Sequence, residues 1–291
     1  MQKITFADAG FNGFWQTADN PVNKEVAVIV LGGTEGKKTI PVKIGKKFAE
    51  NGIDSLGMRY WNAEGLPKYL VKVPLEQFES AIEWLRQRGR KKIFFYGVSK
   101  GAQISLLCAS LMKGIKGVVA VSPSHCVWSG LKGNIIPFQR FLKKAEFTWR
   151  GKELPFTQAR ITYGKAIKAF FKNFQAEISY IYKEGLKNFN EDSVIKVENI
   201  DSSIFFIYPR RDLMWPSKYS VEYMISRLKK FKTDLKIKIM EFHKGSHMMI
   251  PMNPITLKLV AVERKFPNEC RQNRQKAFEA TINWINSISV T

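Results

Sequence analysis

The sequence has little of what marks membrane-spanning or secreted proteins. None of its apolar runs reaches the roughly 18 uncharged residues that a membrane-spanning helix needs. The N-terminal residues lack the apolar core of a signal peptide, so we expect a cytoplasmic protein without a membrane span. The three cysteines, Cys108, Cys126 and Cys270, are far apart and fit neither a disulfide framework nor a CxxC metal site. We expect reduced thiols and no bound metal.

Acidic residues are scarce, with 25 Asp and Glu against 47 Lys and Arg, which gives a formal net charge of +22. Such a charge speeds association with anionic membranes, nucleic acids and phosphorylated small molecules. The basic residues are spread along the chain and form no long Lys/Arg block of the kind that marks a nucleic-acid-binding tail. We therefore interpret the charge mainly as a solvated surface and expect no specific nucleic-acid partner.

Short apolar runs alternate with helical patterns along most of the chain. Continuous apolar runs of this length are typical of strands buried on both faces, and their alternation with helices predicts a mostly parallel sheet covered by helices on both faces. Residues 1–24 are expected to form an edge hairpin. The predicted strands lie at residues 25–31, 53–60, 93–96, 117–122, 203–208 and 235–242, and the predicted helices at 41–51, 75–88, 103–112, 217–230 and 273–288. We expect one α/β domain that spans residues 1–291.

Residues 97–101, Gly-Val-Ser-Lys-Gly, connect a predicted strand to a predicted helix. A nucleophilic serine needs such a sharp turn, and the two glycines let the backbone pass close by. Ser99 is the candidate nucleophile, and the backbone N–H of Lys100, at the start of the helix, is a candidate oxyanion donor. The alternative is an ordinary glycine-rich turn between a strand and a helix.

A second glycine-rich loop, residues 32–36, follows the first buried strand. It lacks the spacings G-x-x-x-x-G-K-[ST] and G-x-G-x-x-G of nucleotide-binding loops, so we expect no cofactor. The corresponding loop of a hydrolase fold supplies the second oxyanion N–H, which here would come from Gly33 or Thr34. Glu35 would then bring a negative charge close to the oxyanion site.

A nucleophilic serine also needs a general base and a carboxylate that orients the base. Of the three histidines, we favour His247, which follows the last predicted strand, over His243 and His125. Asp212 follows a predicted strand at the same sheet edge, whereas Asp201 precedes that strand and is expected at the opposite edge. The chain order Ser, Asp, His is that of α/β-hydrolases.

Residues 127–199 interrupt the alternation of strands and helices. Aromatic and basic side chains alternate in this segment, a pattern that suits either stacking on single-stranded nucleic acid or a lid of short helices over an active site. We favour the lid, because an insertion between sheet strands is where such folds carry one. The candidate substrate-binding residues are Phe138, Phe141 and Trp149 in this segment and Trp215 beyond it.

Several segments resemble the C-terminal domain of the family of acyl-CoA thioester hydrolases and bile acid-CoA:amino acid N-acyltransferases. They include Gly-Leu-Pro at residues 65–67, Gly-Val-Ser-Lys-Gly-Ala at 97–102, Asp212 followed by Trp215, and Gly-Ser-His at 245–247. The resemblance runs from about residue 25 to the end. It implies an α/β-hydrolase domain in which Ser99, Asp212 and His247 match the catalytic triad.

The sequence departs from members of that family in three respects. Family members that act on acyl-CoA carry an N-terminal β-sandwich domain, whereas fewer than about thirty residues here precede the first predicted core strand. The amino-acid-conjugating members use cysteine where this chain has Ser99, which favours water as the acyl acceptor. Glu35 also makes the loop at residues 32–36 less glycine-rich than that of the family.

Together these features predict a serine hydrolase that cleaves a small-molecule acyl ester or an acyl-CoA thioester. Three alternatives remain open. The first is a carboxylesterase, similar to dienelactone hydrolase, that does not use CoA. The second is an acyltransferase. The third is a non-catalytic module of the same fold that binds anionic partners through its charge.

Overall fold

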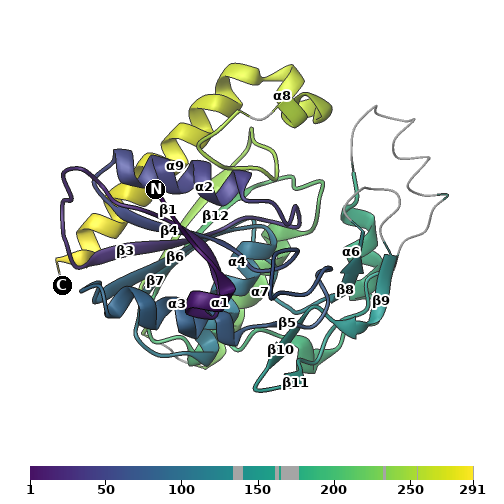
Figure 1. Ribbon diagram of the computed structural model, residues 1–291. Helices are drawn as coiled ribbons and strands as arrows, with labels where there is room; N and C mark the ends of the chain where they lie inside the picture. Colours follow the sequence, from purple (N-terminus) through teal and green to yellow (C-terminus); the bar gives the residue numbers. More distant parts are fainter. Residues whose placement is uncertain (134–139, 161–163, 165–176, 232–233, 254, 291) are drawn as a thin grey trace.

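The computed structural model describes residues 1–133, 140–160, 164, 177–231, 234–253 and 255–290 (Figure 1). Eight strands form the central sheet in the order β1-β2-β4-β3-β6-β7-β12-β13. All neighbours from β4 to β13 are parallel, while β1 and β2 pair antiparallel to each other and β2 pairs antiparallel to β4. The strands are β1 (Gln2–Ile4), β2 (Asn12–Gln16), β3 (Val26–Leu31), β4 (Asp54–Arg59), β6 (Lys92–Val98), β7 (Ile115–Val121), β12 (Ser203–Pro209) and β13 (Ile237–Phe242).

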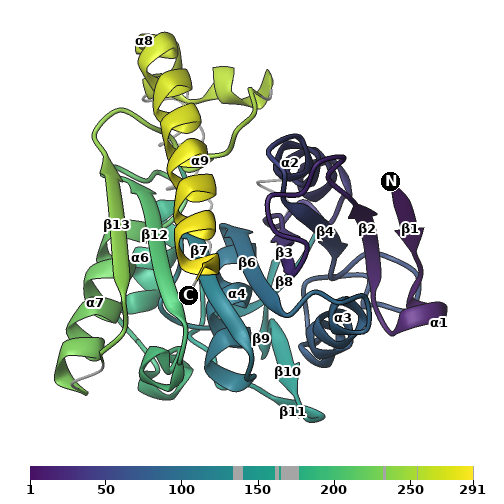
Figure 2. The same cartoon turned by 90° about the vertical axis from the view of Figure 1, so that its left-hand side faces the viewer.

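Helices cover both faces of the sheet, as Figures 1 and 2 show. Helices α2 (Thr39–Glu50) and α9 (Pro267–Ser289) pack on one face, and α3 (Glu76–Arg86), α4 (Lys100–Leu111) and α7 (Ser217–Lys230) pack on the other. Strand β3 illustrates how both faces are covered, because successive side chains of a strand point to opposite faces. Val28 belongs to the core under α2 and α9, and Ile29 to the core under α3, α4 and α7. The predicted mostly parallel sheet with helices on both faces is confirmed, and so is the N-terminal hairpin.

Most element boundaries lie within a few residues of their predicted positions. The main difference is α9, which begins at Pro267 rather than near Asn273. Proline at the start of a helix is favourable because its missing N–H would have no partner there in any case. A 3-10 helix (Ile255–Leu259) and the short helix α8 (Ala261–Lys265) precede α9 and were not predicted. A further short helix, α1 (Phe6–Ala9), lies within the N-terminal hairpin.

The described part of the segment at residues 127–199 is built more from short strands than from the helices that its sequence predicts. Strand β10 pairs in parallel with β5 (Val73–Pro74), outside the segment. Such strands escape detection from sequence because they are short and partly exposed, so they lack a continuous apolar run. The elements are β8 (Ser129–Lys132), β9 (Arg140–Ala145), β10 (Phe147–Trp149), β11 (Lys152–Glu153), α6 (Ser179–Leu186) and two 3-10 helices, Glu191–Ser193 and Val197–Asn199. The role of this segment as a lid stays a prediction.

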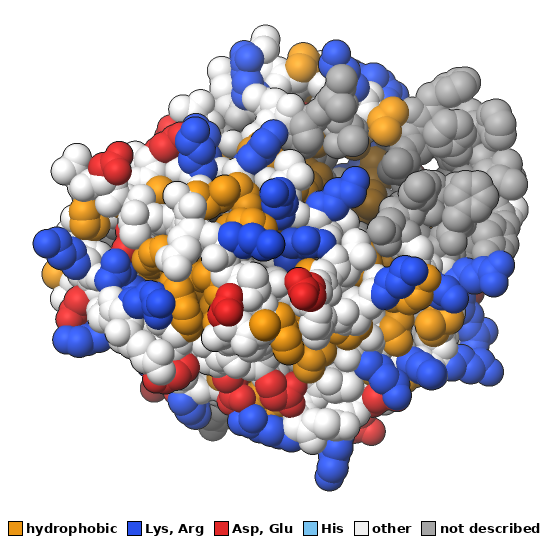
Figure 3. Space-filling view, in the orientation of Figure 1, with side chains coloured by type: hydrophobic (Ala, Val, Ile, Leu, Met, Phe, Trp, Pro, Cys, Tyr) orange, Lys and Arg blue, Asp and Glu red, His pale blue; other side chains and the backbone are white. Residues whose placement is uncertain are grey.

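The surface reflects the composition. Figure 3 shows Lys and Arg side chains scattered over one face of the molecule, with a smaller number of acidic side chains between them. Among the described residues, none of the helices combines the length and apolar character needed to cross a bilayer.

Candidate active site

Ser99 lies at a sharp turn between β6 and α4, as predicted. Its backbone has φ 57° and ψ −117°, a conformation that a non-glycine residue rarely adopts and that is typical of a nucleophile elbow. A Cβ atom at Gly97 would lie 2.2 Å from the carbonyl oxygen of Gly101, and one at Gly101 would lie 2.5 Å from that of Gly32. Both glycines are therefore required by the close approach of the backbone.

His247 and Asp212 form a buried hydrogen bond at the same edge of the sheet. The distance between His247 Nδ1 and Asp212 Oδ2 is 2.8 Å, and the two residues are 7% and 9% exposed. Asp212 Oδ1 accepts hydrogen bonds from the backbone N–H groups of Met214 and Trp215 at 2.9 and 3.4 Å. These contacts orient the carboxylate, which in turn holds the proton on Nδ1 and leaves Nε2 available as a base.

The loops that carry Ser99, Asp212 and His247 follow β6, β12 and β13, which run parallel to one another. The carboxyl ends of parallel strands meet at one sheet edge, which is where α/β folds place their sites. Among the residues that the structure describes, the Ser99 hydroxyl makes no hydrogen bond to the His247 imidazole. Catalytic contacts of this kind are often long without substrate and shorten when substrate binds.

The other two histidines lie in different surroundings. His125 is buried among aromatic rings with Nδ1 2.9 Å from Ser220 Oγ, and burial lowers the pKa of His125 to about 4. His243 is exposed and lies 3.0 Å from the Arg210 guanidinium. Asp201 is also exposed and forms an ion pair with Lys113 at 3.0 Å. The hydrogen bond between Asp212 and His247 thus joins the two residues that the sequence favoured.

The loop at residues 32–36 borders the candidate nucleophile. A Cβ atom at Gly33 would lie 3.4 Å from Ser99 Cβ and 3.7 Å from Ser99 Oγ. The Tyr60 hydroxyl donates to the carbonyl oxygens of Gly32, at 3.1 Å, and of Gly33, and so holds the loop in place. Gly33 therefore lies next to Ser99, and its backbone N–H and that of Lys100 remain the candidate oxyanion donors. Thr34, the other candidate donor, follows Gly33 and is partly exposed.

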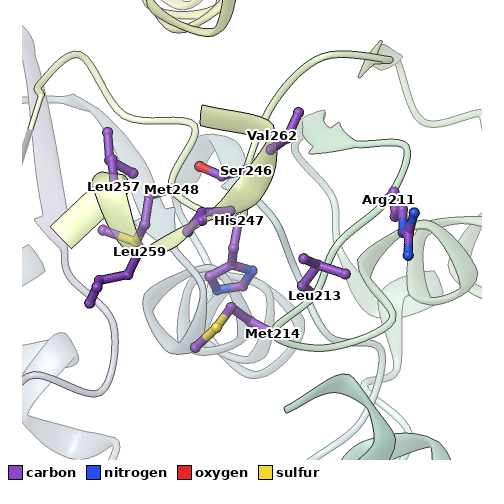
Figure 4. A pocket seen from close by; sticks show the side chains of 10 residues that line it. Arg211, Leu213, Met214, Ser246, His247, Met248, Leu257, Leu259 and Val262 are labelled. Carbon is purple, nitrogen blue, oxygen red and sulfur yellow. The ribbon is translucent and has the colours of Figure 1, made fainter. Parts of the chain in front are cut away.

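A cavity of about 200 Å³ lies beside the His247 ring (Figure 4). It lies where three loops meet, one after β12, one after β13 and one leading into α8, and most of its side chains are apolar. The lining residues are Arg211, Leu213, Met214, Ser246, His247, Met248, Leu257, Leu259, Val260 and Val262. None of these except His247 was a candidate from the sequence.

Those predicted substrate-binding aromatics that the structure describes do not line this cavity. Phe138 falls outside the described residues. Phe141 and Trp149 are partly buried and pack against the hydrophobic core. Trp215 is 3% exposed, meets the His247 ring edge-on with 5.7 Å between ring centroids, and donates through Nε1 to the Ser122 carbonyl at 2.8 Å. It therefore packs against the candidate base.

Lys100 also contributes a side chain that sequence reasoning missed. Its ammonium forms an ion pair with Glu146, and the side chains of the two residues are 1% and 0% exposed. The Lys100 nitrogen lies 4.9 Å from the centroid of the Trp215 ring, and Glu146 also accepts from Gln103 Nε2 at 3.1 Å and from the Trp128 backbone N–H at 3.3 Å. The one available signal was that Glu146 is the single acid among the basic residues at 140–150.

The sheet topology and a serine at the elbow after β6 define the chain as an α/β-hydrolase in fold. A family model described as BAAT / Acyl-CoA thioester hydrolase C terminal matches residues 73–264, about two thirds of the chain. The chain belongs to this family, as its sequence motifs predicted.

Curated relatives match over part of their length. Acyl-coenzyme A thioesterase 1 of Homo sapiens is 26% identical over 184 residues, which cover 62% of this chain and 39% of the human protein. Mitochondrial acyl-coenzyme A thioesterase 2 of Rattus norvegicus is 34% identical over 80 residues, or 26% of this chain and 18% of the rat protein. The match thus spans at most about two fifths of these relatives.

Solved structures share the fold at low sequence identity. A puromycin-hydrolyzing peptidase of Mycobacterium tuberculosis has a TM-score of 0.58 and 12% identity, over 96% of this chain and 37% of that chain. The Pyrococcus furiosus esterase Pf2001 has a TM-score of 0.51 and 16% identity, over 93% of this chain and 85% of that chain. Likeness at this identity establishes the fold alone.

Proposed function

We propose that the protein is a serine hydrolase that cleaves an acyl ester or thioester through Ser99, His247 and Asp212. The observation that carries the proposal is the buried hydrogen bond of 2.8 Å between His247 and Asp212, at the sheet edge where the strained elbow presents Ser99. A general base fixed in one tautomer beside a serine on such an elbow is the arrangement that activates a hydroxyl as a nucleophile.

In the proposed reaction, His247 Nε2 takes the proton of Ser99 as Oγ attacks the acyl carbonyl carbon. The backbone N–H groups of Lys100 and of Gly33 or Thr34 donate to the resulting oxyanion. Collapse of this intermediate breaks the bond to the leaving group, which receives the proton from His247. Water, deprotonated by His247, then attacks the acyl-enzyme and releases the carboxylic acid and free Ser99.

A CoA thioester is the more specific substrate that we propose, supported by the names of the curated relatives and by the charge of the chain. Arg140, Lys143 and Lys144 lie on β9 and are exposed, so they are available to a phosphorylated leaving group. We expect their joint replacement by glutamine to lower kcat/KM for acyl-CoA by about tenfold or more, because three charge contacts are lost, and to spare simple esters.

The matched control replaces Lys3, Lys229 and Lys230, which are also exposed and lie on β1 and at the end of α7. It removes the same charge at other places and should leave both rates near their native values. Equal activity of the β9 variant on both substrate types would contradict a role of β9 in binding CoA. Turnover of simple esters alone by the native protein would favour the carboxylesterase alternative.

A further inference from the structure

The cavity beside His247 points to the acyl group of the substrate, an inference that rests on the proposed function. Its side chains are mainly Leu, Met and Val, and the ring that would act as the base is among the groups that line it. Figure 4 shows His247 and Met214 facing the same space, with Met248, Leu257 and Leu259 on one side of it. An apolar space next to a catalytic group excludes water and gains affinity by enclosing hydrocarbon.

The size of the cavity limits the chain that it can enclose. An apolar protein cavity of about 150 Å³ binds benzene, which has six carbon atoms. On the same scale, the cavity of about 200 Å³ encloses a tail of about eight carbon atoms. We propose that this cavity is the acyl-binding pocket and that it selects unbranched acyl groups of up to about eight carbons.

A series of unbranched esters with acyl chains of 2 to 16 carbons tests this proposal. We expect kcat/KM of the native protein to rise about threefold to fourfold per methylene group and to stop rising near eight carbons, because further carbons bury no more surface. Val262→Phe fills part of the pocket from α8 and should end the rise two to four carbons earlier. Ala261→Val, on the same helix but outside the cavity lining, should keep the native profile.

Labelling of Ser99 by a small fluorophosphonate distinguishes a failure of the acyl-pocket proposal from a failure of the proposed hydrolase function. A Val262→Phe variant that is labelled at the native rate but keeps the native chain-length profile would overturn the acyl pocket and leave the hydrolase intact. A native profile that continues to rise through 16 carbons would overturn it as well. A folded native protein that is not labelled would overturn the proposed function, and the pocket assignment with it.

A second, independent observation concerns Glu35. Its carboxyl group and the Ser99 side chain both lie close to Gly33. A Cβ atom at Gly33 would lie 3.2 Å from Glu35 Oε2 and 3.7 Å from Ser99 Oγ, and one at Gly32 would lie only 2.0 Å from Glu35 Oε1. The carboxyl is thus folded back onto the loop whose N–H groups are the candidate oxyanion donors. The backbone N–H groups of Glu35 and Gly33 favour its charged form.

Few charges compensate this carboxyl. The ionisable groups on neighbouring elements are engaged elsewhere or exposed. Tyr60 donates to Gly32 and Gly33, and Arg59 to Gly36 and Asn62. Lys100 pairs with Glu146 and His247 with Asp212, while Lys37 is exposed and the Lys38 ammonium lies over the Phe14 ring. Burial therefore outweighs the two N–H groups and raises the pKa of Glu35 to about 7. The loop holds a carboxyl that changes its charge near neutral pH.

We infer that the ionised Glu35 carboxylate occupies the place beside the Gly33 N–H that the oxyanion takes, and that the enzyme turns over when this carboxyl is neutral. A carboxylate there competes for the donor and repels the developing negative charge. Protonation removes both effects. The negative charge of Glu35 therefore limits the reaction at alkaline pH.

The pH dependence of kcat/KM for an activated ester, measured from pH 5.5 to 9 with the rate of Ser99→Ala subtracted, tests this inference. We expect the native rate to fall at least tenfold above about pH 7 and the rate of Glu35→Gln to stay level there. Glu64→Gln, which changes an exposed carboxyl in a nearby loop, should follow the native profile. A parallel fall in Glu35→Gln, or its inactivity at all pH values while Ser99 is still labelled, would overturn the inference.

Stability gives a second measurement. A raised pKa means that the folded state holds the Glu35 proton more tightly than the unfolded state, so this group stabilises the fold less as pH rises from about 4.5 to about 7. The decrease in stability between about pH 4.5 and pH 7 should be smaller in Glu35→Gln than in the native protein and in Glu64→Gln. Identical pH dependence of the unfolding midpoint in all three proteins would contradict a Glu35 carboxyl with a raised pKa. A failure of Ser99 labelling in the native protein would instead overturn the proposed function.

Discussion

Replacement of Ser99 by alanine is expected to lower kcat for an acyl ester by roughly 10⁵- to 10⁶-fold, the scale on which a serine hydrolase loses activity without its nucleophile. The loss is this large because no acyl-enzyme can form and His247 and Asp212 then have no hydroxyl to activate. What remains comes from the oxyanion donors and from substrate binding. The measurement is steady-state turnover of one activated ester by native and variant protein at equal concentration.

A matched control distinguishes the loss of a nucleophile from the loss of any serine near it. Ser110 lies near the end of the same helix α4, is partly buried and donates to the Leu107 carbonyl at 2.9 Å. Ser110→Ala should keep nearly all activity. A residual rate in Ser99→Ala within tenfold of the native rate would show that another group carries the reaction.

The second large effect is expected on stability, at the buried ion pair between Lys100 and Glu146. Burial raises the pKa of Glu146 and lowers that of Lys100, and the charge of each partner opposes the shift of the other. Glu146→Gln keeps an acceptor for Gln103 and for the Trp128 N–H but leaves the Lys100 ammonium without a counter-charge. We expect it to lower the free energy of unfolding by about 3 to 5 kcal/mol, measured by denaturant titration.

The double variant Lys100→Met/Glu146→Gln tests whether the unpaired charge is the cause. It should regain most of the lost stability, because methionine fills a similar volume without a charge. Asp201→Asn is the control, since it breaks the ion pair with Lys113 in which both side chains are more than half exposed, and should change stability far less. If the double variant is as unstable as Glu146→Gln, the lost stability comes from weakened hydrogen bonds to residue 146 and not from the unpaired charge.

This ion pair also links the segment at residues 127–199 to the candidate nucleophile. Glu146 lies between β9 and β10, and Lys100 is the residue directly after Ser99. The Lys100 ammonium lies over the Trp215 ring, which itself packs against His247. The insertion is therefore joined through Glu146 to the elbow and, through Lys100 and Trp215, to the candidate base.

The sequence predicted the central fold well because strong patterns specify it. Strand β3 reads as an unbroken apolar run because both of its faces are covered, and Gly97 and Gly101 are required by backbone contacts that no other residue permits. Ser99, Asp212 and His247 could be chosen because the ends of parallel strands share one sheet edge. These features are local in sequence or follow from topology.

The remaining parts depend on contacts between distant segments. Strand β9 has only one buried side chain and carries no continuous apolar run, so its pairing cannot be predicted from the sequence pattern. The cavity forms where loops after β12 and β13 meet the residues before α8, and no motif marks its Leu, Met and Val side chains. Glu146 is recognisable as a partner only once Lys100 is known to be buried.

Intact-mass analysis after reaction with a fluorophosphonate tests the central claim most directly. The native protein and the Ser99→Ala and His247→Ala variants would be treated side by side, and each folded state checked by circular dichroism. We predict that the native protein gains the mass of one probe, that Ser99→Ala gains none and that His247→Ala reacts far more slowly. A folded native protein that gains no mass, or a Ser99→Ala variant that is labelled as fast as the native protein, would contradict the assignment of Ser99 as the nucleophile.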